Sequence, residues 1–296
     1  MAGVVGRSSL RGAGTGYLSW PLPWPDHARP PPRRTTASTR ARKADDVTYC
    51  IAMRLDEGLV FLADTRTNAG VDNVSTYRKL HVFQPSDDRL FVLESAGNLA
   101  STQQVLDQIE ADLEAQAPVS LATVANLHEA ALYVGRIGVA VADQHRAALD
   151  RVGADGTCTL ILGGQVHGHR PDVLMIYPEG NYIRASDDRP FLQIGETKYG
   201  KHMLELAVEE HLGLGDAIKV AIASMVSTEL ANLSVGPPYD LAVYRNGSLE
   251  LQETRIEADS AILGLVQERW RTHLLLALRE LPDFDPDDLS GSLGAD

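Results

Sequence analysis

The chain has 296 residues, of which 44% are hydrophobic and 23% are charged, and its formal net charge is −13. Such a length and composition suffice for a large hydrophobic core, whereas the acidic balance disfavours nucleic acid and anionic membranes as partners. No stretch of about 18 apolar residues could span a bilayer, and the N-terminus lacks the pattern of a secretion signal, so we expect a cytoplasmic protein. Cys50 and Cys158 lie in apolar, strand-like runs and are expected to be buried free thiols.

Composition divides the chain into three parts. Residues 1–47 are rich in proline and arginine and show no hydrophobic period, which predicts a disordered extension. This extension could be a basic interaction tail, a segment that is removed, or a product of a misplaced start if the codon of Val47 is GTG. Residues 48–282 are expected to form the folded domain, and residues 283–296 an acidic, solvated tail.

From Thr48 onward the pattern alternates between strand pairs and helix pairs. The segments 48–54 and 59–64 read as a hairpin, because "LDEG" between them suits a tight turn, and 77–83 with 89–97 read as a second pair. Apolar spacing predicts helices at 98–116, 121–148, 198–212, 214–233 and 258–280. Further strands are expected at 158–166, 172–178, 181–186, 191–195, 239–247 and 249–257.

This order of elements predicts the fold class. Consecutive strands form hairpins, which argues against a parallel doubly wound sheet. Two antiparallel sheets, with helix pairs on their outer faces, account for the pattern with few long loops. We therefore expect an α+β protein, specifically a four-layer α/β/β/α sandwich.

Several chemistries are not supported by motifs. His167 and His169 form an "HGH" that is expected to place both imidazoles on one side of a short strand, but no third ligand lies nearby in sequence, so no metal site is predicted. The chain has no G-x-S-x-G elbow, and the glycines of "LILGGQ" do not open a helix as a phosphate-binding loop would.

Three polar residues at the ends of the early strands remain: Thr48, Asp64 and Lys79. Neighbouring strands of a hairpin sheet bring such positions within reach of one another. A threonine with a free α-amine can act as a nucleophile, because an amine of pKa near ~8 can take its proton. A lysine beside the hydroxyl would favour the alkoxide, and an aspartate would hold the lysine. A plain Asp–Lys ion pair beside a strand threonine accounts for the same residue types.

The combined segments resemble a known family. "TYCIAMRLDEGLVFLADTRTNAG", "YRKLHVF" and "ESAGNLAS" resemble the start of a proteasome β-type subunit, and the match is closest to the bacterial proteasome-like family called Anbu. The resemblance extends from Thr48 to about Glu257 and includes "IGETKYGK" and "NLSVGPPYDLAVY". It implies the fold of the N-terminal nucleophile hydrolases, self-assembly into a ring or an open helix, and no cofactor.

The resemblance also implies roles for individual residues. Thr48 corresponds to the nucleophile, Asp64 to the carboxylate that pairs with lysine, and Lys79 to the activating cation. Gly97 corresponds to the glycine whose N–H donates to the oxyanion. The positions that line the pocket for the residue before the cut correspond to Thr67, Ser95 and Leu99.

The chain departs from the proteasome pattern in its supporting residues. Glu196 stands where proteasomes have a serine, and Asn232, Ser234 and Gly236 replace the residues that orient the amine; Ser234 is our candidate for contact with the threonine amine. The spacing from Thr48 to Lys79 is one residue shorter than in proteasomes, which a deletion in the loop 70–77 would explain without reversing a strand face.

The expected function is that of a proteasome-like threonine peptidase or amide hydrolase that works through an acyl-enzyme on Thr48. Two alternatives stay open: a self-assembling protein with little or no peptidase activity, and a hydrolase of small amides. The substrate and any unfoldase partner are not determined by the sequence.

Overall fold

The computed structural model describes residues 48–68 and 74–283. The expectations for the extension 1–47 and for residues 284–296 of the tail therefore fall outside the described residues, as does the middle of the loop 70–77 in which a deletion was expected.

The first sheet has five antiparallel strands in the order β10-β1-β2-β11-β12. Its strands are β1 (Tyr49–Leu55), β2 (Gly58–Asp64), β10 (Phe191–Gly195), β11 (Tyr239–Arg245) and β12 (Leu251–Ile256). The central strands β1 and β2 form the expected hairpin, with Cys50 opposite Ala63 and Leu55 opposite Gly58. Both strands are buried on both faces, so their sequences are almost continuously apolar.

The second sheet is also antiparallel, in the order β5-β6-β7-β8-β9. Its strands are β5 (Leu80–Ser86), β6 (Arg89–Gly97), β7 (Cys158–Val166), β8 (Asp172–Ile176) and β9 (Tyr182–Arg184). A separate two-stranded hairpin, β3 (Arg66–Asn68) with β4 (Val74–Thr76), follows β2.

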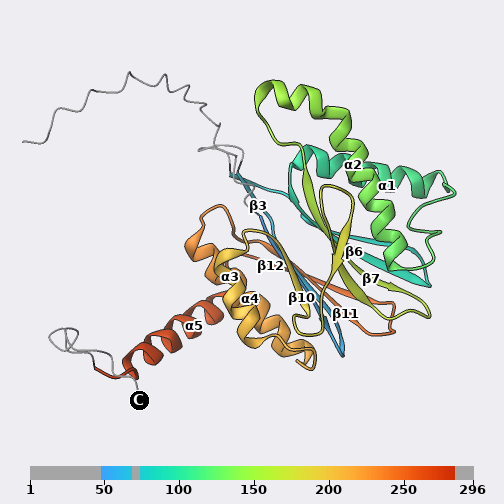
Figure 1. Cartoon of the computed structure of the whole chain (residues 1–296). Helices are drawn as coiled ribbons and strands as arrows, with labels where there is room; N and C mark the ends of the chain where they lie inside the picture. The colour runs from blue at the N-terminus through green and yellow to red at the C-terminus, as the bar shows by residue number, and fades with distance from the viewer. Residues whose placement is uncertain (1–47, 69–73, 284–296) are drawn as a thin grey trace, which may run out of the picture. The chain divides into compact units, whose positions relative to one another are not determined.

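Helices cover the outer faces of both sheets, as Figure 1 shows. The second sheet carries α1 (Leu99–Glu114) and α2 (Leu127–Val152), and the first carries α3 (Lys198–Ala207) and α4 (Leu214–Ala231). A fifth helix, α5 (Ala261–Arg279), contacts α4. Leu263 is the one buried residue of Ala261–Arg279, and the rest of α5 is partly or fully exposed.

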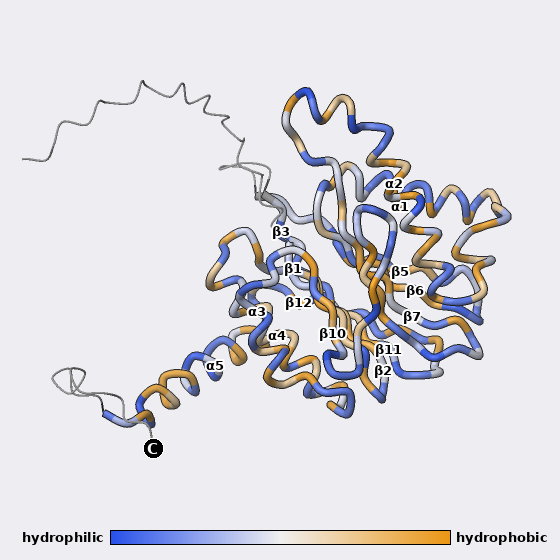
Figure 2. Tube along the Cα trace, viewed as in Figure 1, coloured by the Kyte–Doolittle hydropathy of each residue, from blue (hydrophilic) through white to orange (hydrophobic). Residues whose placement is uncertain are grey.

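Three hydrophobic cores hold these layers together. Figure 2 shows hydrophobic residues, in orange, along the strands of the sheets. One lies between α1, α2 and the second sheet, one lies between the two sheets, and one lies between the first sheet and α3 with α4. Strand alternation divides the side chains among these cores: on β1, Ile51 and Met53 face the helices, whereas Cys50 and Ala52 face the other sheet. The predicted α/β/β/α sandwich is confirmed.

The expected elements are present with shifted ends. Helix α2 begins at Leu127 rather than at 121, because the side chain of Asn126 accepts the N–H of Glu129, and Glu129 accepts the N–H of Ala125 in return. Helix α3 ends at Ala207, five residues before the predicted end at 212. Both cysteines are buried free thiols, as expected. No helix of the described residues is long and apolar enough to cross a membrane.

Candidate active site

Thr48 lies directly before β1, at the end of the β1–β2 hairpin that is opposite to the turn. Its carbonyl accepts a hydrogen bond of 2.6 Å from the N–H of Glu196, the residue after β10, and Thr48 is 8% exposed. Gly195, which is opposite Tyr49, allows this approach, since a Cβ there would lie 1.9 Å from the Thr48 carbonyl oxygen. The backbone of Thr48 is thus positioned by sheet pairing rather than by a loop.

Asp64 and Lys79 form a buried ion pair beside Thr48. Lys79 Nζ lies 2.7 Å from Asp64 Oδ1, and it also donates to the carbonyl of Arg66 at 2.7 Å. The same carboxylate oxygen accepts the backbone N–H of Tyr49, the residue after Thr48, at 2.9 Å. Asp64 therefore fixes the ammonium of Lys79 and the start of β1 at one point.

The carboxyl of Asp64 is in a strongly desolvated position, with an exposed fraction of 0%. Burial raises its pKa above the ordinary value, while the Lys79 ammonium and the N–H groups of Tyr49 and Gly236 act against that rise. Gly236 contributes the most distant of these donors, at 3.4 Å from Oδ2.

Gly97 ends β6 and has a backbone φ of 115° that other residues rarely adopt. A Cβ at this position would lie 2.6 Å from the carbonyl oxygen of Thr157, so the backbone approach itself requires glycine. Asn98, the next residue, caps α1 by accepting the N–H of Ser101. Gly97 thus lies at a strand-to-helix junction, as expected from the sequence.

Two of the three residues expected to line a substrate pocket lie close to Lys79. The N–H of Ser95 donates to the carbonyl of Lys79 at 3.0 Å, and Thr67 lies on β3 next to Arg66, whose carbonyl accepts Lys79 Nζ. In the described part of the chain, the buried hydroxyl of Thr67 has no hydrogen-bond partner. Leu99 begins α1 with 37% of its surface exposed.

Of the supporting residues that were expected from the loop after α4, Asn232 contacts Glu196. The side-chain amide of Asn232 donates to Glu196 Oε2 at 3.1 Å, and the backbone N–H of Ser234 donates to Asn232 Oδ1 at 3.1 Å. Since Glu196 also holds the Thr48 carbonyl through its N–H, this loop is connected to the start of β1. Asn232 is therefore linked to the Thr48 carbonyl by two hydrogen bonds, both made by Glu196.

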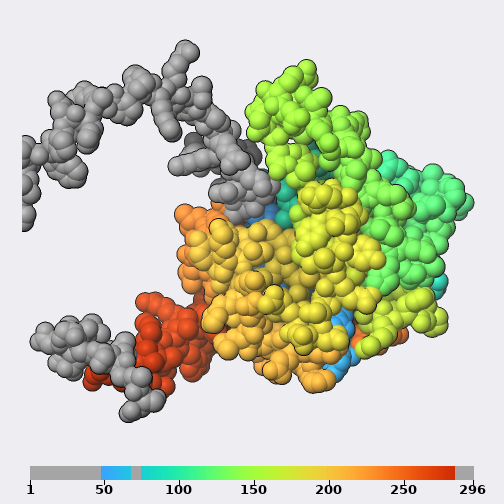
Figure 3. Space-filling view, in the orientation of Figure 1, coloured from blue at the N-terminus to red at the C-terminus, as the bar shows by residue number. Residues whose placement is uncertain are grey.

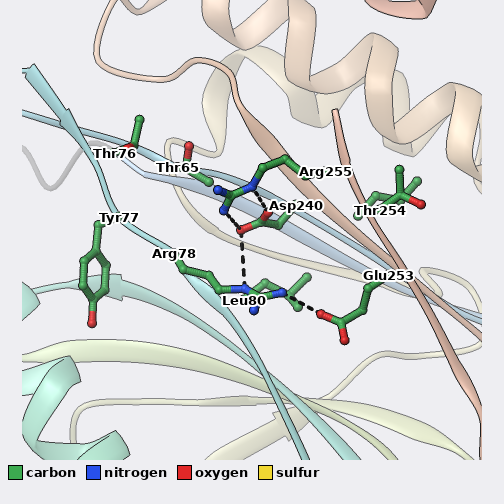
Figure 4. Close-up of a pocket in the computed structure, with 10 residues that line it drawn as sticks. Thr65, Thr76, Tyr77, Arg78, Leu80, Asp240, Glu253, Thr254 and Arg255 are labelled. Atoms are coloured by element: carbon green, nitrogen blue, oxygen red, sulfur yellow. Dashed lines mark hydrogen bonds and ion pairs between the residues drawn. The ribbon is translucent and has the colours of Figure 1, made fainter. Parts of the chain in front are cut away.

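A cavity of about 490 Å³ opens beside the segment that precedes β5 (Figure 4). Arg255 donates to Asp240 at 2.8 and 3.0 Å, and Arg78 lies 2.6 Å from Glu253 and 3.8 Å from Asp240. Thr48, Asp64 and Lys79 do not line this cavity. Its charged groups compensate one another, so we interpret it as an ion-pair network that joins the β4–β5 connection to β11 and β12.

Within the described part of the chain, no group of three or more histidine, cysteine, aspartate or glutamate side chains could hold a metal ion. His167 and His169 lie in the turn between β7 and β8, not on a strand, which corrects their expected placement on one side of a short strand.

Solved structures match most of the chain. Anbu (Gly-1) mutant from Hyphomicrobium sp. strain MC1 shares 41% identity with a TM-score of 0.74 and covers 80% of this chain and 99% of its own. Anbu (ancestral beta-subunit) from Yersinia bercovieri shares 39% identity with a TM-score of 0.74 and covers 80% of this chain and 100% of its own.

The chain belongs to the Anbu family. The resemblance found in the sequence motifs is thereby confirmed, and so is the proteasome-like fold of this family. A structure of the helical assembly of the Anbu complex from Pseudomonas aeruginosa is similar as well, with 38% identity, a TM-score of 0.75 and coverage of 81% of this chain and 99% of its own. No protein-family model and no curated protein matches the chain.

Two residues near this Anbu site were missed by the sequence reasoning. The guanidinium of Arg66 donates to the carbonyls of Leu233 and Val235 at 2.8 and 3.0 Å, and packs against Gly236 so closely that a Cβ there would lie 2.1 Å from Arg66 Cζ. Arg66 thereby positions the loop whose Gly236 N–H donates to Asp64. The local sequence does not predict this role, because the partners of Arg66 lie about 170 positions away. The second such residue is Glu94, which is fully buried on β6.

Proposed function

We propose that this Anbu protein is an N-terminal threonine hydrolase that cleaves peptide or amide bonds through Thr48. The observation that carries the proposal is that Asp64 Oδ1 accepts both Lys79 Nζ and the N–H of the residue after Thr48. Through this shared oxygen, the buried ammonium of Lys79 is linked to the backbone of the residue that follows the candidate nucleophile. A buried ammonium favours an adjacent alkoxide more strongly than an exposed one would.

The reaction follows from these groups. The α-amine of Thr48 takes the hydroxyl proton, and Oγ attacks the substrate carbonyl carbon. The N–H of Gly97 donates to the developing oxyanion. The C–N bond then breaks, the leaving amine takes the proton, and an ester remains on Thr48. Water hydrolyses that ester, which releases the acid and restores the hydroxyl and the amine.

The proposal requires Thr48 to be the first residue of the working protein. An amide nitrogen in a longer chain cannot act as the base, because only a free amine has a basic pKa. Intact-mass measurement of the protein from its own cells is expected to give a chain that begins at Thr48. The codon of Val47 tests the origin of this terminus: GTG would indicate translation from that position, and any other codon would require a protease.

Labelling with a threonine-directed β-lactone or epoxyketone tests the nucleophile. We expect protein that starts at Thr48 to gain the mass of one probe, and Thr48→Ala to gain none. Thr76→Ala, an exposed threonine on β4, is the matched control and should label like the wild type. Labelling that survived in Thr48→Ala would assign the nucleophile to another residue.

A second function, self-assembly with little peptidase activity, is favoured by the surface of α5. Leu274 and Leu278 lie one turn apart on this helix and are 50% and 64% exposed. Figure 3 shows α5 in red beside the orange α4, with much of its surface open. Exposed apolar stripes of this kind mark interaction surfaces, and an Anbu relative forms a helical assembly.

We propose that the stripe on α5 contacts a second copy of the chain. The double substitution Leu274→Glu and Leu278→Glu should reduce the mass found by analytical ultracentrifugation, because charges would be buried in the contact. Leu206→Glu, on an exposed position of α3, is the control and should leave the mass unchanged. A mass unaffected by the double substitution would exclude this surface.

Activity and assembly are separable by experiment. If protein that starts at Thr48 assembles but takes no probe and cleaves neither a peptide library nor small amides, the assembly function stands alone. Cleavage of small amides without cleavage of peptides would favour the small-amide hydrolase. A cytoplasmic location and an unfoldase partner stay predictions.

A further inference from the structure

Glu94 is a fully buried carboxyl group in the core between the two sheets. It lies on β6 directly opposite Leu80 and Ile161, whose side chains belong to that core, and its exposed fraction is 0%. Within residues 48–68 and 74–283, neither of its carboxyl oxygens has a partner at hydrogen-bond geometry. Buried polar groups without partners are rare in native proteins, so this one requires an explanation.

The charge state of Glu94 follows from its surroundings. An ionised carboxylate in an apolar core is so unfavourable that the group takes up a proton instead. Burial raises the pKa of Glu94 well above its ordinary value, and the nearby backbone of Leu62 acts against that rise. An apolar side chain of similar size would be more stable at this position. Buried carboxyl groups with a strongly shifted pKa are frequent at functional sites.

The backbone of Glu94 adjoins the segment that carries Lys79. Glu94 pairs with Leu80, the residue after Lys79, and the N–H of Ser95 donates to the Lys79 carbonyl at 3.0 Å. Any displacement of β6 at Glu94 therefore acts on Lys79 through neighbouring backbone contacts.

The opposite sheet contributes Cys50, whose thiol donates to the carbonyl of Ser95 at 3.7 Å. Burial raises the pKa of Cys50 most, an ionised Glu94 raises it further, Lys79 lowers it and Asp64 raises it. Cys50, on β1, is thus the titratable group that interacts with Glu94 from the opposite sheet. Asp64, at the end of β2, and Lys79, directly before β5, act on the same thiol, whereas β7 contributes the apolar Ile161.

We infer that Glu94 is a positioning residue of the Thr48 centre: as a neutral acid it keeps the two sheets in contact beside Lys79, and loss of its proton loosens β6 there. The inference rests on the proposed function for its effect on Thr48. Ionisation would bring water or a cation into the core, and Lys79 is the cation that could move toward it and away from Asp64. Reactivity of Thr48 should then decline at alkaline pH.

The first measurement is the pH dependence of unfolding of the full chain. Between the ordinary pKa of glutamate and the raised pKa of Glu94, the folded state holds one proton more than the unfolded state. Stability is therefore greatest below that ordinary pKa and falls as the pH rises. Relative to Glu94→Gln, the wild-type unfolding constant should rise up to about tenfold per pH unit in this range. Glu110→Gln, at an exposed position of α1, is the matched control, and its unfolding should show the same pH dependence as the wild type.

The second measurement is hydrogen exchange of the Ser95 amide, which reports on the contact with Lys79. Protection in the wild type should fall at alkaline pH relative to Glu94→Gln, since base catalysis of exchange affects both proteins equally. Glu94→Met, which keeps the length of the side chain, replaces Glu94→Gln if an uncharged amide prevents folding. Equal protection in the wild type and the variant at every pH overturns the inference.

The third measurement separates this inference from the proposed function. In protein that starts at Thr48, the probe should react at the same rate with the wild type and Glu94→Gln near neutral pH, and faster with the variant at alkaline pH. Identical pH profiles overturn the inference while the nucleophile stands. If no protein takes the probe, the proposed function fails, and unfolding with Ser95 exchange still decides the role of Glu94.

Discussion

Replacing Lys79 with methionine removes the cation that compensates Asp64 in the described part of the chain. Asp64 is then a fully buried carboxylate with the N–H groups of Tyr49 and Gly236 as its remaining partners. Such a group takes up a proton in the folded state. At pH 7 this protonation lowers the free energy of unfolding by about 1.4 kcal/mol for each pH unit between the unfolded pKa of about 3.9 and the solution pH, which gives about 4 kcal/mol. The value agrees with the roughly 3–5 kcal/mol found when buried ion pairs lose one partner.

Urea unfolding at pH 7 and pH 5 tests this reasoning. Without Lys79 the folded pKa of Asp64 rises further above its unfolded value, so the stability of the variant is greatest below the unfolded pKa and is lost as the pH rises. The deficit of Lys79→Met against the wild type should therefore shrink at pH 5 by up to about 2.7 kcal/mol.

The matched control is Lys219→Met on α4, whose ion pair with Asp216 is largely exposed. It should cost less than about 1 kcal/mol at either pH. The double variant Asp64→Asn with Lys79→Met should be more stable than Lys79→Met alone, because it no longer contains the unpaired acid. An equal deficit of Lys79→Met at both pH values would refute the argument.

The remaining predictions concern glycines. Gly200→Ala should lower stability by about 1–3 kcal/mol in urea unfolding, because its Cβ would lie 2.3 Å from the hydroxyl of Tyr49; Gly138→Ala in α2, which meets nothing within 4 Å, should raise stability by about 0.5–1 kcal/mol. Gly97→Ala should lower the free energy of unfolding by about 1–3 kcal/mol and abolish labelling of Thr48, because neither the backbone φ nor the space at this position accommodates a side chain. Gly153→Ala, at φ 66° in open space, should cost about 1–2 kcal/mol and leave labelling unchanged, and equal labelling in both variants would contradict the role of Gly97.

The fold was predictable because its signals are local. Hairpin turns, strand alternation and helix spacing each depend on residues a few positions apart, and they gave the two sheets and the helix pairs. The ends of elements were less predictable. The start of α2 depends on two hydrogen bonds, from the N–H of Glu129 to the Asn126 side chain and from the N–H of Ala125 to the Glu129 side chain. The apolar spacing that begins at 121 does not reveal them.

The candidate site was predictable in part. Asp64 and Lys79 stand at the ends of early strands in a family motif, and the structure brings their side chains into contact. Two contacts could not be expected from the sequence, because they join residues about 170 positions apart. They are the hydrogen bond from the Gly236 N–H to Asp64 and the hydrogen bonds from Arg66 to the loop at 233–235. Such contacts depend on how the two ends of the domain meet.

By itself, the sequence determined which residue types stand at the ends of the first strands and that they match the Anbu motifs. Only the tertiary structure decided the surroundings that control their chemistry. Period-two alternation turns Glu94 toward the core, but whether a partner meets it there depends on the opposite sheet, which offers Cys50 and apolar side chains. Burial and the presence of a partner set the charge of a carboxyl group, and both are properties of the packed layers rather than of any one strand.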